Sequence, residues 1–114
     1  MDLSGKKILI DPGHGGAFPG VTYKGRQEKD CTLKISKALE NLLEEEGATV
    51  YMTRTRDKDF GGKDIEDDIN KRVEYINNRY TGKGIDVLLS IHVNTERFIS
   101  RCQRRLYFDP PSPV

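Results

Sequence analysis

The chain has 114 residues, which is enough for one small domain and too few for two of ordinary size. Its 19 Lys and Arg residues against 18 Asp and Glu residues leave a formal net charge of +1, so no global field would gather nucleic acid or an anionic membrane. No segment approaches the roughly 20 apolar residues of a membrane span, and the N-terminus lacks the apolar run of a signal peptide. Partners must therefore be argued from a specific site.

The two cysteines, Cys31 and Cys102, follow neither a CxxC nor a zinc-ribbon spacing. They therefore form neither a disulfide framework nor a cysteine metal cluster. A single bridge between them stays open, and the sequence does not fix their redox state.

The first half of the chain predicts a strand, a helix and a second strand. Lys7 to Ile10 is an apolar run closed by Asp11-Pro12-Gly13, which is typical of a buried strand that ends in a loop. From Glu28 to Glu46 apolar residues recur at helical spacing, and Gly47 stands at the expected C-terminal stop. Ala48 to Arg54 is β-branched and aromatic, so it predicts a strand reached through a tight turn.

The second half repeats this alternation. Arg56 to Asp67 is charged and contains glycine, which predicts an exposed loop. One face of a second helix is then marked by Ile69, Val73, Ile76 and Tyr80. The nearly continuous apolar run within Gly84 to Asn94 predicts a central parallel strand covered on both faces. Right-handed crossovers between such elements predict an α/β fold with an open, mainly parallel sheet flanked by helices.

Both histidines of the chain are expected at one edge of this sheet. His14 follows the first strand within ILIDPGHGG (residues 8–16), and His92 lies at the end of the third strand. Ligands of open parallel sheets gather outside the carboxyl ends of the strands. Glu28 opens the first helix directly after the loop that carries His14, so its carboxylate should face the same rim.

These three residues predict a His₂Glu zinc site. Zn²⁺ favours imidazole and carboxylate ligands, and a hydrolytic zinc site typically keeps three protein ligands with water in an open position. The ligands would be His14, Glu28 and His92, and glycines at 13, 15 and 16 would let the backbone approach the metal.

Each part of this site also has another interpretation. A single histidine is more often a surface or core residue than a ligand, and Glu28 could simply complement the helix dipole. The glycine loop could instead cradle a phosphate. However, the GxGxxG pattern has Phe18 at its last position, and Arg26 stands where the Walker pattern requires lysine. A nucleotide binder therefore remains an alternative without a completed motif.

Several further polar residues are given structural interpretations in preference to functional ones. Asn94 could orient a ligand or bind substrate, but asparagine after a strand is typical of a turn. Arg72 and Asn77 could reach substrate, but a solvated helix face or a helix-end hydrogen bond is the simpler interpretation. The charges from Arg54 to Asp59 are interpreted as a solvated loop.

Four motifs occur in a recognisable order: ILIDPGHGG, EKD at 28–30, TRTRD at 53–57 and LLSIHVN at 88–94. From about Lys7 to Asn94 the chain thus resembles the zinc-dependent N-acetylmuramoyl-L-alanine amidases, the amidase_3 family of cell-wall hydrolases. The resemblance implies a three-layer sandwich with zinc held by His14, Glu28 and His92. It also implies hydrolysis of the amide between N-acetylmuramic acid and L-alanine in peptidoglycan, in an extracellular, periplasmic or cell-wall location.

The chain departs from this family after the third motif. The family's catalytic glutamate lies in a late segment of a longer domain, and nothing after His92 matches it. Glu96 is a nearby carboxylate, but its position is not the family's, so the catalytic base is unassigned. Residues 1–114 are therefore interpreted as one partial amidase_3 catalytic domain, truncated at its C-terminal end. The alternative is a non-catalytic module that holds zinc or muropeptide without cleaving it.

The last 20 residues suggest two contact features. Arginines at 97, 101, 104 and 105 could form a basic surface, and RRLYFDPPS at 104–112 resembles the strand that follows the third motif in full-length amidases. Truncation would also leave an exposed sheet edge and apolar surface, through which self-association is expected.

Overall fold

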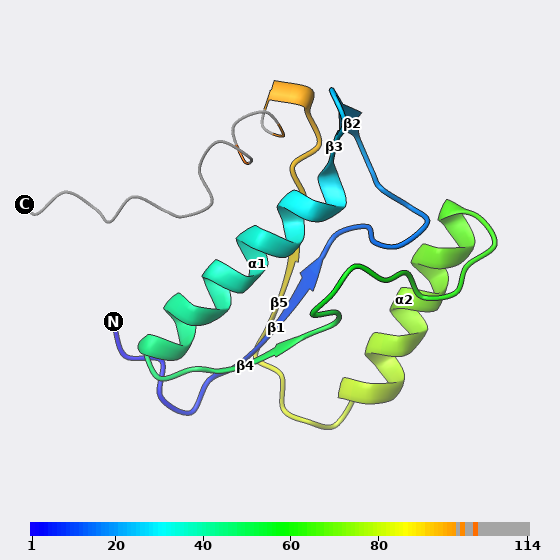
Figure 1. The fold of residues 1–114 in the computed structure, drawn as a ribbon. Helices are drawn as coiled ribbons and strands as arrows, with labels where there is room; N and C mark the ends of the chain where they lie inside the picture. Colours follow the sequence, from blue (N-terminus) through cyan, green and yellow to red (C-terminus); the bar gives the residue numbers. More distant parts are fainter. Residues whose placement is uncertain (98, 100–101, 103–114) are drawn as a thin grey trace, which may run out of the picture.

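The computed structural model describes residues 1–97, 99 and 102 of the chain (Figure 1). Its elements in chain order are β1 (Lys7–Pro12), β2 (Thr22–Tyr23), β3 (Arg26–Gln27), α1 (Glu28–Glu45), β4 (Thr49–Met52), α2 (Ile65–Tyr80) and β5 (Val87–Ile91). The strands and helices predicted between Lys7 and Asn94 are all present, and the short β2–β3 hairpin before α1 was not predicted. The predicted strand at 104–112 and the arginines at 101, 104 and 105 lie outside the described residues.

The main sheet is parallel and has the order β4-β1-β5. The crossover through α1 leads from β1 to one side, and the crossover through α2 leads from β4 to the other. Because both crossovers are expected to be right-handed, the two helices cover opposite faces. Alternation along β1 agrees, since Ile8 and Ile10 share an apolar cluster with Leu39 of α1, whereas Asp11 pairs with Arg72 of α2. The predicted α/β fold with helices flanking a parallel sheet is thereby confirmed.

The apolar core lies between this sheet and α1. Ile8, Ile10 and Ala48 are buried there. Partly buried apolar side chains pack around them: Leu3, Leu39, Leu43, Val50, Met52, Leu89 and Ile91. Full burial of one such aliphatic side chain contributes about 1.5–3 kcal/mol, so this layer is the main source of hydrophobic stabilisation.

The predicted place of the third strand is wrong for the described residues. β1 is the central strand, and β5 pairs with β1 alone within the part of the chain that is described. Val87 and Leu88 are 46% and 50% exposed. An apolar run indicates that both faces of a strand are apolar, but it does not predict where in the sheet the strand lies. The order of the strands depends on the direction of each crossover. Among the described residues the outer edge of β5 has no strand paired with it, as expected, while self-association stays a prediction.

Helix α2 begins and ends close to the predicted positions, but its apolar face is largely open. Ile69 and Val73 are 54% and 49% exposed, and the residues that α2 buries are Asp68, Arg72 and Tyr80. At the C-terminal end of the helix, the ring of Tyr80 packs 5.7 Å from that of Tyr51 on β4. Nearer the carboxyl ends of the strands, polar contacts replace apolar ones. No helix in the described residues is long and apolar enough to cross a membrane.

Candidate metal centre

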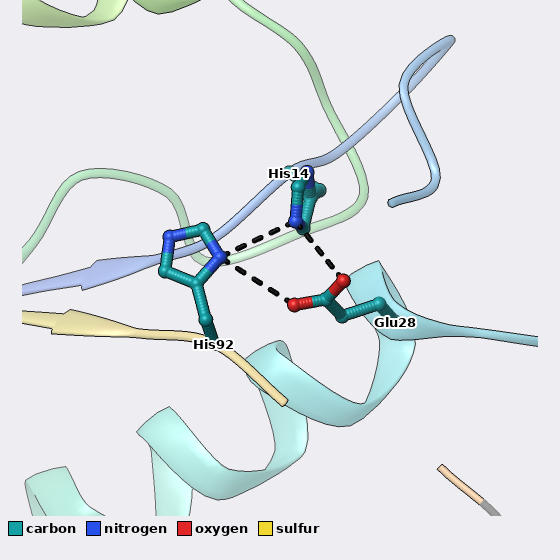
Figure 2. Close-up of side chains that lie close together, drawn as sticks. All are labelled: His14, Glu28 and His92. Atoms are coloured by element: carbon teal, nitrogen blue, oxygen red, sulfur yellow. Dashed lines mark hydrogen bonds and ion pairs between the residues drawn. The ribbon is translucent and has the colours of Figure 1, made fainter. Parts of the chain in front are cut away.

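Three side chains converge at the carboxyl ends of β1 and β5 (Figure 2). His14 lies in the loop after β1, His92 directly follows β5, and Glu28 is the first residue of α1. Nε2 of His14 lies 3.3 Å from Nδ1 of His92. The carboxylate of Glu28 completes the triangle, with Oε1 3.2 Å from His14 and Oε2 3.4 Å from His92. The three residues that the sequence predicts to share a rim are therefore brought together.

Parallel pairing explains why the two histidines meet. Pro12 at the end of β1 is in register with Ile91 at the end of β5, and the Gly13 N–H extends the ladder to the Ile91 carbonyl over 2.9 Å. The residues that follow each strand therefore leave the sheet side by side. A Cβ atom at Gly13 would collide with the ring of His92, so glycine is required at this crossing.

The carboxylate of Glu28 is buried and well supplied with donors. Its side chain is 1% exposed, and backbone N–H groups donate to it from Val21 (3.1 Å), Val93 (2.9 Å) and Asn94 (3.2 Å). Burial is the largest single influence and raises the pKa of Glu28, but these three donors and nearby His14 together outweigh it and lower the pKa. The carboxylate is therefore held ionised and fixed in direction.

The imidazole of His14 is held in its neutral form. Burial is the largest cause that lowers the pKa of His14, and the charge of Arg72 acts in the same direction, while Glu28 opposes both. A neutral imidazole offers the lone pair that a metal ion requires. The side chains of His14 and His92 are 26% and 38% exposed, so the buried carboxylate forms the floor of the centre and the two rings form its open side.

The arrangement fits a tetrahedral cation such as Zn²⁺. Donor atoms bound at about 2.0–2.1 Å in a tetrahedron lie about 3.3–3.4 Å apart. Here Nε2 of His14 and Nδ1 of His92 lie 3.3 Å apart, and Glu28 approaches them with different oxygens, Oε1 at 3.2 Å from His14 and Oε2 at 3.4 Å from His92. One donor atom from each residue lies within 4.8 Å of the other two, so a small cation between them would be within reach of all three. Two imidazole nitrogens and one carboxylate are also the ligand set of hydrolytic zinc sites that keep a fourth position open.

Glycines shape the centre, although not all of those expected. Gly13 makes room for the ring of His92, whereas side chains at Gly15 and Gly16 would meet Lys58 and Asp59 rather than a metal position. The prediction for these two glycines is therefore wrong, because they make room for the loop after β4. Gly20 was missed. A Cβ there would lie 2.5 Å from the His14 ring and 2.7 Å from Glu28 Oε1, and the φ of Gly20 is +72°.

Arg54 corrects the prediction of a solvated loop. It is 3% exposed and donates to the carbonyls of Pro12 (3.1 Å) and Gly13 (3.0 Å). The loop that follows is exposed in part, but Asp57 and Asp59 accept from the N–H groups of residues 16 and 17. The charged segment at 54–59 therefore holds the glycine-rich loop in place through these hydrogen bonds.

Arg72 corrects the prediction of a solvated helix face. It is 8% exposed, and its guanidinium binds Asp11 at 2.6 Å, the Pro12 carbonyl at 2.9 Å and the His14 carbonyl at 2.8 Å. Its position inside the apolar stripe of α2, three residues after Ile69, was an unused signal that the charge is buried and paired. The carbonyl of Asn77 accepts from Thr81 at the helix end, in line with the structural interpretation of that residue.

The two polar residues after His92 have different positions. Asn94 adopts a left-handed φ of 62°, which asparagine tolerates in turns, and its N–H reaches Glu28. Its backbone thus orients a candidate ligand. Glu96 is exposed, and the ligand group found among the described residues consists of the other three residues without it. Cys31 and Cys102 are free thiols, so the open question of a bridge is answered in this structure by two unpaired cysteines.

Two open pockets adjoin His14. One, of about 330 Å³, lies between α2 and the β5 side of the sheet and is lined by both histidines, Phe18, Ile69 and Leu88, among others. The other, of about 770 Å³, lies between residues 17–20 and the first residues of α2, Ile65 among them. Both are bordered by apolar side chains, so the open side of the centre has space for a large molecule.

Comparisons with known proteins identify the family of the chain. The model of a family described as N-acetylmuramoyl-L-alanine amidase, Amidase_3, matches residues 8–100. The sporulation-specific N-acetylmuramoyl-L-alanine amidase of Bacillus subtilis is 44% identical over 91 residues, which are 78% of this chain and 31% of that protein.

Solved structures give the same result. The CwlD amidase of Clostridioides difficile, determined in complex with the GerS lipoprotein, superposes with a TM-score of 0.67 at 29% identity, over 77% of this chain and 48% of that one. An N-acetylmuramoyl-L-alanine amidase of Clostridium difficile 630 gives a TM-score of 0.63 at 36% identity, over 81% and 45%. The chain thus spans less than half the length of each of these three proteins. Because the family match covers most of its residues, the chain belongs to the N-acetylmuramoyl-L-alanine amidase family Amidase_3.

Proposed function

We propose that this chain carries the zinc centre of a cell-wall amidase that hydrolyses the bond between N-acetylmuramic acid and L-alanine in peptidoglycan. The observation that carries the proposal is the convergence of His14, Glu28 and His92, each of which offers a donor atom within 4.8 Å of the other two. Membership of the family suggests which amide bond is cleaved. The geometry gives a reason to assign these three residues as the metal ligands.

The three residues would have different roles in the centre, because their surroundings differ. Glu28, fixed by three backbone donors, would provide a negative charge at the floor of the centre, and the neutral imidazole of His14 would complete the ligand set together with the ring of His92. When bound there, Zn²⁺ polarises an amide carbonyl and lowers the pKa of water toward about 7. The carboxylate of Glu28 is buried away from solvent. The rings of His14 and His92 are partly exposed, so substrate could reach the centre from their side.

The substrate class implies the place of action. Peptidoglycan lies outside the cytoplasmic membrane, so we propose a cell-wall, periplasmic or other extracellular location. The pockets beside Phe18 and Ile65 would receive the parts of the glycopeptide next to the scissile amide. The backbone of Asn94 is used to hold Glu28, but its side chain is exposed at the same rim and is proposed to contact substrate.

No general base is assigned among the described residues. Glu28 serves as a ligand in this proposal, and Glu96 is exposed and outside the ligand group. Loss of general-base catalysis typically lowers rates by about 10² to 10⁴. A module that binds zinc or muropeptide without cleaving it is therefore the second candidate, and the tests below separate the two.

Zinc stoichiometry in the purified 114-residue chain tests the ligand set. We expect about one zinc per chain, and loss of zinc in His14→Ala, His92→Ala and Glu28→Gln. Glu96→Gln is the matched control for Glu28→Gln, because it makes the same change at an exposed glutamate of the same rim. Unchanged stoichiometry in His14→Ala or His92→Ala would refute the assignment.

Release of soluble fragments with new L-alanine amino termini from purified peptidoglycan tests the reaction. Cleavage that disappears in His14→Ala and persists in Lys71→Ala, an exposed position on α2, would support the amidase. Zinc binding with muropeptide affinity and no cleavage would favour the non-catalytic module. Cleavage that falls by 10² or more in Glu96→Gln at full zinc content would instead identify Glu96 as the base, at about the cost expected for losing one.

A further inference from the structure

We propose that Arg72 is a positioning residue for His14. Its guanidinium fixes the backbone of the loop that carries this ligand, so that Nε2 of the ring faces Glu28 and His92. The inference rests on the proposed zinc centre. It goes beyond that centre because it assigns a function to a residue of α2, a helix that supplies none of the three ligands.

The contacts of Arg72 are directed at the ligand loop. One nitrogen donates to Asp11 over 2.6 Å and to the Pro12 carbonyl over 2.9 Å, and the other donates to the carbonyl of His14 itself over 2.8 Å. One guanidinium therefore joins the end of β1 to the ligand residue. The contact with the His14 carbonyl acts on the ligand residue directly.

The guanidinium is itself immobilised. It is buried, paired with Asp11, and its central carbon lies 4.5 Å from the centre of the Phe60 ring. A stacked, paired arginine presents its donors in one fixed plane. Lysine carries the same charge as a single flexible point and cannot span Asp11 and two carbonyls in this geometry.

His14 depends on such a support for two reasons. Its φ of 65° lies in the left-handed region, which residues other than glycine rarely adopt, so surrounding contacts must hold it there. Metal-binding histidines are usually oriented through a hydrogen bond from their second ring nitrogen. The ring of His14 contacts Glu28 and His92 through Nε2, while Arg72 binds the carbonyl of the same residue, so Arg72 acts on the backbone from which the ring projects.

Arg54 supports the same loop but does not replace Arg72. It reaches the Pro12 and Gly13 carbonyls from the α1 side, and it stops one residue short of His14. The two guanidiniums together hold three consecutive carbonyls, and Arg72 alone holds that of the ligand.

Zinc affinity, measured by competition with a chromophoric chelator, tests this inference without relying on activity. We expect Arg72→Lys to weaken zinc binding by roughly 10–100-fold, the usual effect of changing a group that orients a metal ligand. Thr53→Val is the matched control. It removes a 2.6 Å hydrogen bond to Asp11 in the same buried network, but Thr53 does not contact His14. We expect it to lower the melting temperature at wild-type zinc affinity.

The outcomes separate this inference from the proposed function. A wild-type chain that binds no zinc would overturn both. Zinc binding that is equal in wild type and Arg72→Lys would overturn the positioning role and leave the centre intact. Affinity losses in Thr53→Val as large as those in Arg72→Lys would also overturn it, because they would report the stability of the network alone.

A second variant covers the case in which Arg72→Lys fails to fold. Phe60→Leu removes the ring that stacks on Arg72 but retains the Asp11 ion pair. Weakening of zinc binding by about threefold or more, a reduced form of the orienting effect, would support the inference. Wild-type affinity in this variant would overturn it.

Discussion

The two faces of the sheet are built from different chemistry. The face toward α1 is closed by aliphatic side chains around Ile8 and Ile10. The face toward α2 packs Tyr51 against Tyr80 at the far end, but near the candidate metal centre it holds Asp11 and Arg72 beside an open pocket. The larger apolar cluster thus lies on the α1 face, while the other face, which also buries Leu9, uses directed hydrogen bonds near the candidate centre to hold the loop that carries His14.

This division has a physical reason. Apolar contacts are non-directional, so they resist unfolding without fixing the direction of a particular carbonyl. Hydrogen bonds from a buried guanidinium are directional and are strengthened in a low-dielectric environment. A loop that must present a histidine at a φ of 65° is therefore better held by the polar face than by the apolar one.

The largest effect is expected from a truncation in the α1 layer. Ile10→Ala removes a side chain that is 0% exposed on the central strand, and we expect a loss of about 2–5 kcal/mol in the free energy of unfolding. The control is Ile69→Ala on α2, where the side chain is 54% exposed and a loss below about 1 kcal/mol is expected. Urea unfolding of both variants measures the difference. Similar losses would mean that the α2 face contributes as much apolar stabilisation as the α1 face.

A smaller loss in the free energy of unfolding is expected when Arg54 is replaced, because Arg54 joins the glycine-rich loop to α1 through hydrogen bonds. Arg54→Met leaves the buried carbonyls of Pro12 and Gly13 without this donor, and we expect a loss of about 1–3 kcal/mol. Arg56→Met makes the same change at an exposed position of the same loop and should stay within about 0.5 kcal/mol. If both variants unfold at the same urea concentration, the carbonyls find other donors and the directed-bond argument is wrong.

Two glycines distinguish backbone strain from crowding of the centre. Gly20 and Gly25 have φ values of +72° and +77°, so alanine at either position should cost a similar amount, about 1–2 kcal/mol. A Cβ at Gly20 would press on the His14 ring and Glu28, whereas at Gly25 nothing lies within 4 Å. We therefore expect Gly20→Ala to lose zinc affinity and Gly25→Ala to retain it. Equal zinc affinity in titrations of the two variants would contradict the assigned position of the His14 ring.

The elements and the ligand triangle could be predicted from the sequence for a common reason. Periodicity records which side of an element is apolar, and parallel strands deliver the residues after them to one rim, which places His14 and His92 together. The position of Glu28 followed because the helix begins at that residue.

Other features depend on contacts between residues distant in the sequence. Arg72 pairs with Asp11 across 61 positions, and although its place in the apolar stripe of α2 indicates burial, no local pattern identifies Asp11 as its partner. The edge position of β5 depends on the direction of a crossover, and the need for glycine at position 20 appears once the His14 ring is placed. Long-range pairing, strand order and close approach are therefore beyond what local sequence patterns can predict.

The smallest perturbation tests whether the α1 layer stays closed next to the centre. Burial raises the pKa of the Cys31 thiol from 9.0 to about 12, with a further contribution from Cys102. The thiolate is the reactive form, so at about pH 8 this higher pKa lowers the thiolate population, and with it the alkylation rate, on the order of a thousandfold. In Cys102→Ser, where Cys31 is the remaining thiol and burial persists, we expect slow reaction with iodoacetamide in the folded chain and fast reaction in urea. Because Cys31 lies three residues after Glu28 on the buried side of α1, rapid alkylation of the folded chain would mean that this end of the helix opens to water. The carboxylate would then lose the closed surroundings on which its role as a fixed ligand depends.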